Sequence, residues 1–146
     1  MIIRPCEEKD LKVLSAIENI CFPIAPWNLK NFEGEFFDND FAYIYVAEHE
    51  GKILGYVDFW IMFEQGTISK IAVLEPLRKH GIGQILLKDA LNRMAEEGVT
   101  SVTLEVRVSN VAAIKLYEKF GFVKKLLKKG YYSDGEDAYF MMLGEC

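Results

Sequence analysis

A strand, a turn and a helix follow one another in a single stretch of this chain, Ile71-Ala72-Val73-Leu74-Glu75-Pro76-Leu77-Arg78-Lys79-His80-Gly81-Ile82-Gly83-Gln84. The apolar residues at its start are typical of a buried strand. This strand must end at Pro76, because proline has no N–H to donate to a β-ladder and disfavours helix at the residue before it. From Ile82 onward, apolar residues recur at helical spacing as far as Ala95, and Gly98 is suited to cap the helix. The stretch therefore predicts a strand that leads directly into a helix.

The start of this helix has the features of an anion-binding site. The first turn of a helix carries unpaired N–H groups and the positive end of the helix dipole, and glycine lets a phosphate approach the backbone closely. Here Arg78 and Lys79 precede the helix, and Gly81 and Gly83 lie at its start. The pattern is not a Walker loop, because no Gly-Lys-Ser/Thr follows. A generic strand-to-helix turn would explain it about as well, so the loop alone does not decide the function.

Length and composition are those of one globular domain. The chain has 146 residues, of which 51% are hydrophobic and 27% are charged, and this length allows a sizeable core without disulfides or metals. No apolar run approaches the roughly 18 residues of a membrane span, and the N-terminus lacks the features of a signal peptide. We therefore expect a cytoplasmic protein that does not attach to a membrane.

Cysteine usage and net charge narrow the function further. The cysteines Cys6, Cys21 and Cys146 are odd in number and have no Cys-x-x-Cys spacing, which argues against a disulfide framework and against a structural metal. The net charge of −5 argues against direct nucleic acid binding, since phosphate contacts need a basic surface. An acidic chain with one basic loop fits a polyanionic cofactor and a cationic substrate better.

The rest of the chain predicts seven strands and four helices. Strands are expected at 2–4, 41–49, 52–63, 67–73, 101–108, 122–129 and 137–143, and helices at 7–21, 29–37, 81–98 and 110–119. Short turns join the strands between 41 and 73, which predicts an antiparallel meander. The strand at 101–108 follows a crossover helix and should lie parallel to the strand at 67–73. The order β-α-α-β-β-β-α-β-α-β-β thus predicts an α+β fold with a mixed sheet.

The most specific stretch of the sequence runs from Leu104 to Phe122. It resembles the LEVR-x-SN-x-xA-xx-LY-xx-xGF signature of the bacterial ribosomal-protein-alanine N-acetyltransferases (RimI type), which belong to the GNAT superfamily. The Arg-x-x-Gly-x-Gly pattern at 78–83 resembles the pyrophosphate loop of that superfamily. Phe22-Pro23, followed by Trp27, resembles the N-terminal signature of the RimI-type enzymes, although their Trp usually follows the Pro directly. Tyr131-Tyr132 and the following residues 134–138 resemble their substrate-side loop.

The resemblance covers nearly the whole chain and implies both a fold and an activity. The implied fold is a single GNAT domain over residues 1–146, with a mostly antiparallel seven-stranded sheet flanked by about four helices. The implied reaction moves an acetyl group from acetyl-CoA to a primary amine in a ternary complex, without a metal and without an acyl-cysteine. The implied acceptor is the α-amine of a protein N-terminus, typically alanine on a small-subunit ribosomal protein. A monomer or weak dimer is expected.

Two residues match the catalytic positions of the family. Glu105 matches the general base, and Tyr117 matches the general acid that reprotonates the thiolate. An ordinary glutamate pKa of about 4.3 is low for deprotonating an α-ammonium, so burial must raise it or a water chain must relay the proton. Without the resemblance, Glu105 would be interpreted as an exposed strand carboxylate paired with a lysine. Tyr117 would be interpreted as an aromatic residue that packs its helix on the sheet.

The resemblance also assigns the cofactor side of the site. The main chain at the end of the strand at 67–73 would pair with the pantetheine arm and stabilise the thioester oxygen. The residues assigned to this strand end are Ile71, Ala72 and Val73. The residues assigned to the pyrophosphate are Arg78, Lys79, His80, Gly81, Ile82, Gly83 and Gln84. Asn110 would contact the cofactor near its thiol end, and the alternative interpretation of Asn110 is a plain helix N-cap.

The acceptor side is assigned to Trp27, Tyr131 and Tyr132. The acidic residues near Trp27 could in addition attract a basic tail of the acceptor; these are Glu33, Glu35, Asp38 and Asp40. Two alternatives stay open. One is a GNAT enzyme that acetylates a lysine side chain or a small-molecule amine, with the same fold and cofactor residues. The other is a non-catalytic acetyl-CoA-binding module, against which the presence of both Glu105 and Tyr117 argues.

Overall fold

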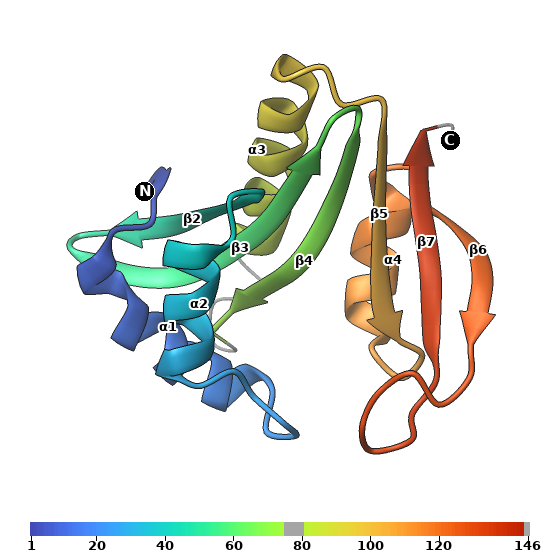
Figure 1. Ribbon diagram of the computed structural model, residues 1–146, viewed down its shortest axis with the longest axis horizontal. Helices are drawn as coiled ribbons and strands as arrows, with labels where there is room; N and C mark the ends of the chain where they lie inside the picture. Colours follow the sequence, from blue (N-terminus) through green and yellow to red (C-terminus); the bar gives the residue numbers. More distant parts are fainter. Residues whose placement is uncertain (75–80, 145–146) are drawn as a thin grey trace.

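The computed structural model describes residues 1–74 and 81–144, so Arg78, Lys79 and His80 lie outside the described residues. The described elements follow the predicted order (Figure 1). They are β1 (Ile2–Pro5), η1 (Glu8–Asp10), α1 (Leu11–Cys21), α2 (Leu29–Asp38), β2 (Ala42–His49), β3 (Lys52–Met62), β4 (Gln65–Val73), α3 (Ile82–Glu96), β5 (Ser101–Arg107), α4 (Val111–Lys119), β6 (Val123–Lys128) and β7 (Ala138–Gly144).

The helix predicted at 7–21 begins with a 3₁₀ turn rather than with α-helix. The Asp10 carboxylate closes this turn by accepting a hydrogen bond from the Glu7 N–H at 2.8 Å. Arg4 donates to both Asp10 oxygens, at 2.7 and 3.0 Å, and ties the turn to β1. The side-chain bonds of Asp10 therefore stop the α-helix from extending back to Glu7.

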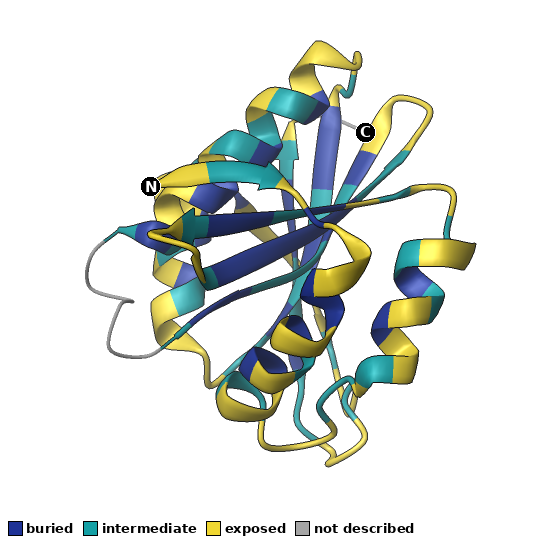
Figure 2. Cartoon of the chain, turned by 90° about the vertical axis from the view of Figure 1, so that its left-hand side faces the viewer, coloured by how far each residue is buried: buried dark blue, intermediate teal, exposed yellow. Residues whose placement is uncertain are grey.

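The strands form one sheet in the order β1-β2-β3-β4-β5-β7-β6, in which only β4 and β5 pair in parallel. This confirms the mixed, mostly antiparallel seven-stranded sheet. Side chains alternate between its two faces, so that Tyr56 packs with α1 and α2 while Val57 packs with α3 and α4. Each face thus has its own core, and Figure 2 shows buried strands between helices whose outer surfaces are exposed.

The parallel pair is short, and this shapes the rest of the molecule. The described pairing of β4 with β5 comprises Gln65↔Ser101, Gly66↔Val102 and Thr67↔Thr103. Beyond these pairs β4 stays on β3 as far as Val73, while β5 stays on β7 as far as Arg107. The two strands therefore diverge from Thr67 onward, and Figure 1 shows the gap that opens between them.

One carboxyl group is buried in the core under α2. Asp58 on β3 is fully buried, and as a carboxylate it finds no hydrogen-bond donor among the described residues. Burial and the neighbouring Glu35 carboxylate raise the pKa of Asp58 to about 10. At neutral pH Asp58 is therefore protonated, and its O–H donates to Glu35.

The proton on Asp58 links stability to pH. The pKa of Asp58 in the folded chain lies above its ordinary value of 3.8. Protonated Asp58 therefore stabilises the fold fully below pH 3.8, and this stabilisation is lost as pH rises towards the pKa of Asp58 in the folded chain. Asp58→Asn keeps a donor for Glu35 without a titrating group. We expect the unfolding free energy of the native chain to fall relative to that of Asp58→Asn by at most about 1.4 kcal/mol per pH unit. Denaturant titrations of both proteins at pH 5, 7 and 9 measure this difference, and a pH-independent difference would contradict it.

Candidate active site

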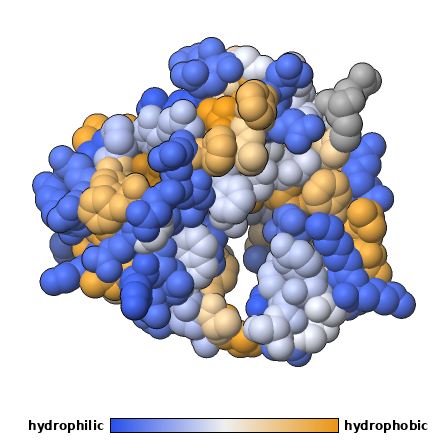
Figure 3. Space-filling model, viewed as in Figure 1, coloured by the Kyte–Doolittle hydropathy of each residue, from blue (hydrophilic) through white to orange (hydrophobic). Residues whose placement is uncertain are grey.

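The site predicted from sequence lies where β4 and β5 diverge. Each of these strands leads into a helix, β4 into α3 and β5 into α4, so both helices begin near this end of the sheet. In Figure 3 the molecular surface is hollowed between the part that contains α1 and α2 and the part that contains β5, β6 and β7. The hollow is therefore bounded by β4 on one side and β5 on the other.

The cofactor side consists of the end of β4 and the start of α3. Ile71 and Val73 face the core under α3, whereas Ala72 faces the core under α1. Along this stretch β4 pairs with β3 on its other edge, through Tyr56↔Ala72 and Gly55↔Val73. Since the described β5 pairing ends at Thr67, the edge of β4 that faces the hollow is the one from which β5 has separated.

The described part of the predicted anion-binding turn is the start of α3, from Gly81 onward. Gly81 is the N-cap with φ of +77°, a conformation that favours glycine. A Cβ added at Gly83 would lie 3.7 Å from Leu116 Cδ2 and from Val73 Cγ2, which is ordinary contact. Packing within the chain therefore does not require glycine at 83. Ile82 is buried, and the Gln84 side chain accepts from Lys119 Nζ at 2.9 Å, so only the backbone of these two residues suits an anion.

Glu105 lies on β5 with its side chain directed away from the α3 core. Its neighbours Leu104 and Val106 are buried in that core, as the alternating pattern predicts. Glu105 Oε1 lies 3.3 Å from Lys128 Nζ, and the Tyr131 hydroxyl donates to the same oxygen at 3.4 Å. The carboxylate is thus paired with a lysine, as the alternative interpretation expected, and it also meets a tyrosine of the predicted acceptor loop.

Tyr117 lies in α4 with its ring buried against Phe122, at 5.8 Å between ring centroids. Burial raises the pKa of Tyr117 above its ordinary value, with a smaller contribution from Tyr132. The hydroxyl is therefore protonated at neutral pH, as a proton donor must be. Asn110 caps the same helix, because its side chain accepts from the Ala113 N–H at 3.2 Å. The capping interpretation of Asn110 is confirmed.

The loop between β6 and β7 is fastened to the end of β5 by Arg107. The Arg107 guanidinium donates to Asp134 at 3.0 Å and to Glu136 at 2.9 Å, and it stacks on the Tyr132 ring at 4.1 Å. Glu136 also accepts from the Ser109 N–H at 3.0 Å. These contacts hold Tyr132 half-buried beside the exposed Tyr131, whose ring it meets edge-on at 5.0 Å.

Trp27 lies in the loop between α1 and α2. Figure 1 shows this loop and the β6–β7 loop on opposite sides of the gap between the β4 and β5 ribbons. Its ring packs edge-on against Phe32 at 5.3 Å between centroids. Its backbone N–H donates to Glu18 Oε2 at 3.0 Å, and Lys70 Nζ lies 4.8 Å from its ring centroid. The predicted acceptor residues therefore occupy two loops that border the hollow from opposite sides.

The prediction that Glu35 attracts a basic acceptor tail is wrong. Glu35 lies on the buried face of α2, where Trp60 Nε1 donates to it at 2.6 Å and Asn39 Nδ2 at 3.0 Å. Burial acts to raise the pKa of Glu35, but the hydrogen bonds from Asp58, Trp60 and Asn39 outweigh it and hold that pKa below its usual range. A charge reversal at Glu35 would disturb the core rather than the acceptor. Glu33, in contrast, is exposed.

Sequence reasoning missed Glu18, Lys70 and the role of Arg107. Glu18 is fully buried and accepts hydrogen bonds from the Tyr56 hydroxyl and from Lys70 Nζ. One signal pointed to it, because helical spacing places Glu18 on the same face of α1 as Leu11 and Leu14. A carboxylate on an apolar helix face needs a partner. The sequence could not identify that partner, since Lys70 is 52 positions away.

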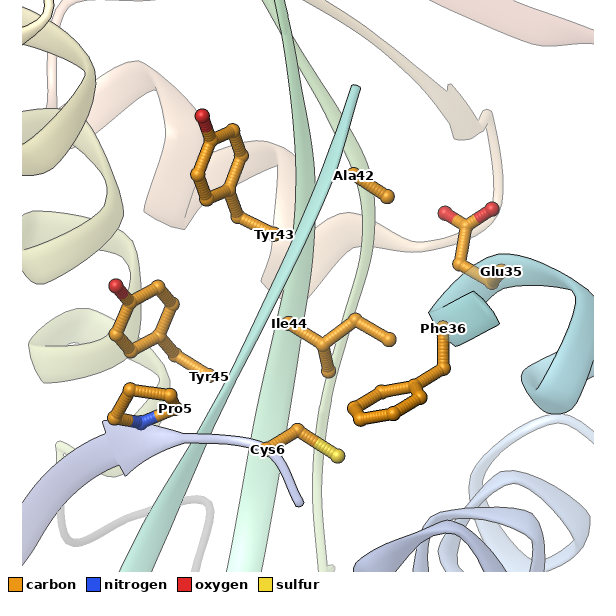
Figure 4. Close-up of a pocket in the computed structure, with 8 residues that line it drawn as sticks. All are labelled: Pro5, Cys6, Glu35, Phe36, Ala42, Tyr43, Ile44 and Tyr45. Atoms are coloured by element: carbon orange, nitrogen blue, oxygen red, sulfur yellow. The ribbon is translucent and has the colours of Figure 1, made fainter. Parts of the chain in front are cut away.

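A pocket of about 190 Å³ lies away from this site, between β1, β2 and α2 (Figure 4). Its wall includes Cys6 and Glu35, and the Glu35 carboxylate is already bonded to Trp60 and Asn39. Burial raises the pKa of the Cys6 thiol to about 12, so it is not a nucleophile at neutral pH. Within residues 1–74 and 81–144, no three His, Cys, Asp or Glu side chains cluster to hold a metal, and no helix is long and apolar enough to cross a membrane.

Comparison with known proteins agrees with this geometry. Residues 11–122 match the model of the Acetyltransferase (GNAT) family. The putative ribosomal protein bS18-alanine N-acetyltransferase of Bacillus subtilis is 34% identical over 140 residues, which cover 95% of this chain and 92% of that protein. The N-alpha-acetyltransferase of Sulfurisphaera tokodaii is 37% identical over 141 residues, which cover 88% of this chain and 80% of that protein.

Among solved structures, the ribosomal-protein-S18-alanine N-acetyltransferase of Escherichia coli superimposes with a TM-score of 0.89 at 31% identity, over 98% of this chain and 92% of that one. The similarity thus extends over nearly the whole of both chains. The family model and the relatives together show that the chain belongs to the GNAT family of acetyltransferases and is similar to its ribosomal-protein-alanine N-acetyltransferases.

Proposed function

We propose that this acetyltransferase modifies the free α-amine of a protein N-terminus, typically alanine on a small-subunit ribosomal protein. The observation that carries the proposal is the position of Glu105, on β5 beside the hollow and hydrogen-bonded to Tyr131 of the β6–β7 loop. A base at this position meets an amine that enters between the two aromatic loops. The names of the relatives support the acceptor class, because they describe acetylation of an N-terminal alanine or of an α-amine.

The residues present fit acetyl-CoA, the acetyl donor of the family, which supplies an activated acetyl thioester. The start of α3 offers a pyrophosphate first-turn N–H groups, a glycine N-cap and a further glycine, Gly83, in that turn. The edge of β4 at Ile71, Ala72 and Val73 would pair with the amides of the pantetheine arm. Arg78, Lys79 and His80 would complete the pyrophosphate site, and the Asn110 side chain would face the thiol end.

The chemistry then divides between two side chains. Glu105 takes a proton from the acceptor ammonium, directly or through water, and leaves a neutral amine. The amine nitrogen bonds to the carbonyl carbon and the carbon–sulfur bond breaks, while a backbone N–H at the end of β4 donates to the carbonyl oxygen as it gains charge. The Tyr117 hydroxyl would give its proton to the departing sulfur, and the second proton that the nitrogen loses would return to Tyr117 through solvent, while Glu105 would release the first proton to solvent. Both catalytic groups come from β5 and from the helix that follows it.

Acceptor class and catalytic roles are tested together by thiol release from acetyl-CoA with two peptides. One peptide has a free N-terminal alanine, and the other has a blocked N-terminus and one free lysine. We expect turnover of the first peptide only. Since general acid–base catalysis contributes about 10²- to 10⁴-fold, Glu105→Gln and Tyr117→Phe should each lower kcat/KM by about 100-fold or more. Exposed Glu64→Gln, in the turn between β3 and β4, is the matched control and should keep the native kcat/KM.

The outcomes separate the alternatives. Turnover of the lysine peptide would support the proposed acetyl transfer but would show that the acceptor is a lysine side chain and not an α-amine. Binding of acetyl-CoA with no turnover of either peptide would indicate a small-molecule acceptor or a non-catalytic binding module. Full activity of Glu105→Gln would remove the base assignment and leave Lys128 and Tyr131 as purely structural partners of Glu105.

The pyrophosphate assignment makes a separate prediction at Gly83. Alanine in a helix is more stable than glycine by about 0.5–1 kcal/mol, and the chain has space for its Cβ. Gly83→Ala should therefore raise the melting temperature slightly while it weakens acetyl-CoA binding about tenfold, because the methyl group displaces the phosphate. Gly34→Ala in α2, where no atom lies within 4 Å of an added Cβ, is the control. Unchanged acetyl-CoA affinity in Gly83→Ala, measured by calorimetry, would contradict a phosphate at this turn.

A further inference from the structure

A buried carboxylate joins three separate segments on the acceptor side. Glu18 of α1 has no exposed surface. Its carboxylate accepts from the Tyr56 hydroxyl on β3, from Lys70 Nζ on β4 at 2.7 Å, and from the Trp27 N–H in the α1–α2 loop at 3.0 Å. The α1–α2 loop is thereby tied to the two strands that it covers.

Lys70 is placed at the wall of the hollow. It lies on β4 beyond Thr67, in the part of the strand from which β5 has separated. Its ammonium lies 5.0 Å from the Phe22 ring centroid and 4.8 Å from that of Trp27, and its side chain is 20% exposed. The ammonium thus contacts Glu18 and two aromatic rings of the α1–α2 loop, and these contacts orient both rings.

Stability alone does not account for this arrangement. Removing two charges from water is unfavourable, and apolar residues of similar volume often stabilise a core as well as a buried ion pair does. Hydrogen bonds to a charged group differ from apolar packing in having a fixed direction. What Glu18 and Lys70 contribute beyond apolar packing is therefore the orientation of Phe22 and Trp27 and of the backbone between them.

We propose that Glu18 and Lys70 are positioning residues for the acceptor, which hold the α1–α2 loop in the orientation that the acceptor binds. This inference rests on the proposed function in so far as it takes a polypeptide N-terminus as the occupant of the hollow. Glu18 lies on α1, and the side chain of Lys70, which directly precedes Ile71 in β4, is directed to Glu18, Phe22 and Trp27 rather than to the start of α3. Changes at Glu18 or Lys70 should therefore alter binding of the acceptor and leave binding of acetyl-CoA as it is.

The test replaces the ionic cluster by apolar side chains of similar size. In the triple variant Glu18→Met, Tyr56→Phe, Lys70→Met, the three polar side chains are removed together, and the group that loses its acceptor is the Trp27 N–H of a partly exposed loop residue. We therefore expect the melting temperature to stay within a few degrees of the native one. The KM for the acceptor peptide should rise about tenfold, and the KM for acetyl-CoA should change less than twofold. Lys70→Arg keeps the charge and should stay within about threefold of the native acceptor KM. Exposed Lys12→Met is the matched control and should not change either KM.

A second measurement does not need an acceptor. Amide hydrogen exchange at Trp27 should accelerate at least tenfold in the triple variant, because the Trp27 N–H loses the Glu18 oxygen. If the triple variant does not fold, Lys70→Met beside Lys70→Arg makes the same comparison of acceptor KM. A native acceptor KM together with native Trp27 protection in a folded variant would overturn the positioning role. If the native enzyme turns over no peptide, the proposed function fails, and Trp27 exchange decides the positioning role by itself.

Discussion

The early end of the β4–β5 pairing is the constraint on which the rest of this structure depends. Three residue pairs join the two strands, and each strand then follows its other neighbour, β4 along β3 and β5 along β7. Backbone groups of a strand edge are strong hydrogen-bonding groups, so an edge freed in this way favours an extended ligand that carries amides of its own. The same divergence separates Lys70 on β4 from Glu105 on β5, and on the proposed function the acceptor would bind between them. A sheet fully paired from end to end would have a stable core but no such site.

Both loops that border the hollow are held by ionic side-chain contacts rather than by backbone ladders. Glu18 is fully buried and holds the loop that carries Trp27 by accepting a hydrogen bond from the Trp27 N–H. Arg107, at the end of β5, is partly exposed to water. It holds the loop that carries Tyr131 and Tyr132 through its ion pairs with that loop and its contact with the Tyr132 ring. A partly exposed ion pair is screened by solvent and contributes little to stability, whereas a buried one is strongly directional. The two loops therefore differ in the carboxylates that hold them, because Glu18 has no exposed surface whereas Asp134 and Glu136 are partly exposed.

Most of the fold was predictable because it follows from local rules. Period-two alternation placed Glu105 opposite Leu104 and Val106, and the preference of Asn for the first position of a helix identified Asn110 as the cap of α4. What the sequence did not predict correctly depends on tertiary contacts. Glu35 was assigned to an acidic surface, but it shares the buried face of α2 with Phe32, three residues earlier, and bonds to Trp60 on β3. The partner of Glu18 is on β4, and no local pattern connects two residues 52 positions apart.

The contact between Glu105 and Lys128 does not compete with a catalytic role for Glu105. The two side chains are 23% and 35% exposed and lie 3.3 Å apart, and ion pairs of this kind contribute about 0–1 kcal/mol. On the proposed function, an acceptor ammonium that enters the hollow would replace one cation beside the carboxylate by another, so little free energy would oppose the exchange. Tyr131 donates to the same oxygen and keeps the carboxylate oriented during it. The lysine pair that sequence reasoning treated as the alternative to a general base is thus compatible with one, because it supplies a weakly held cation that the acceptor can displace.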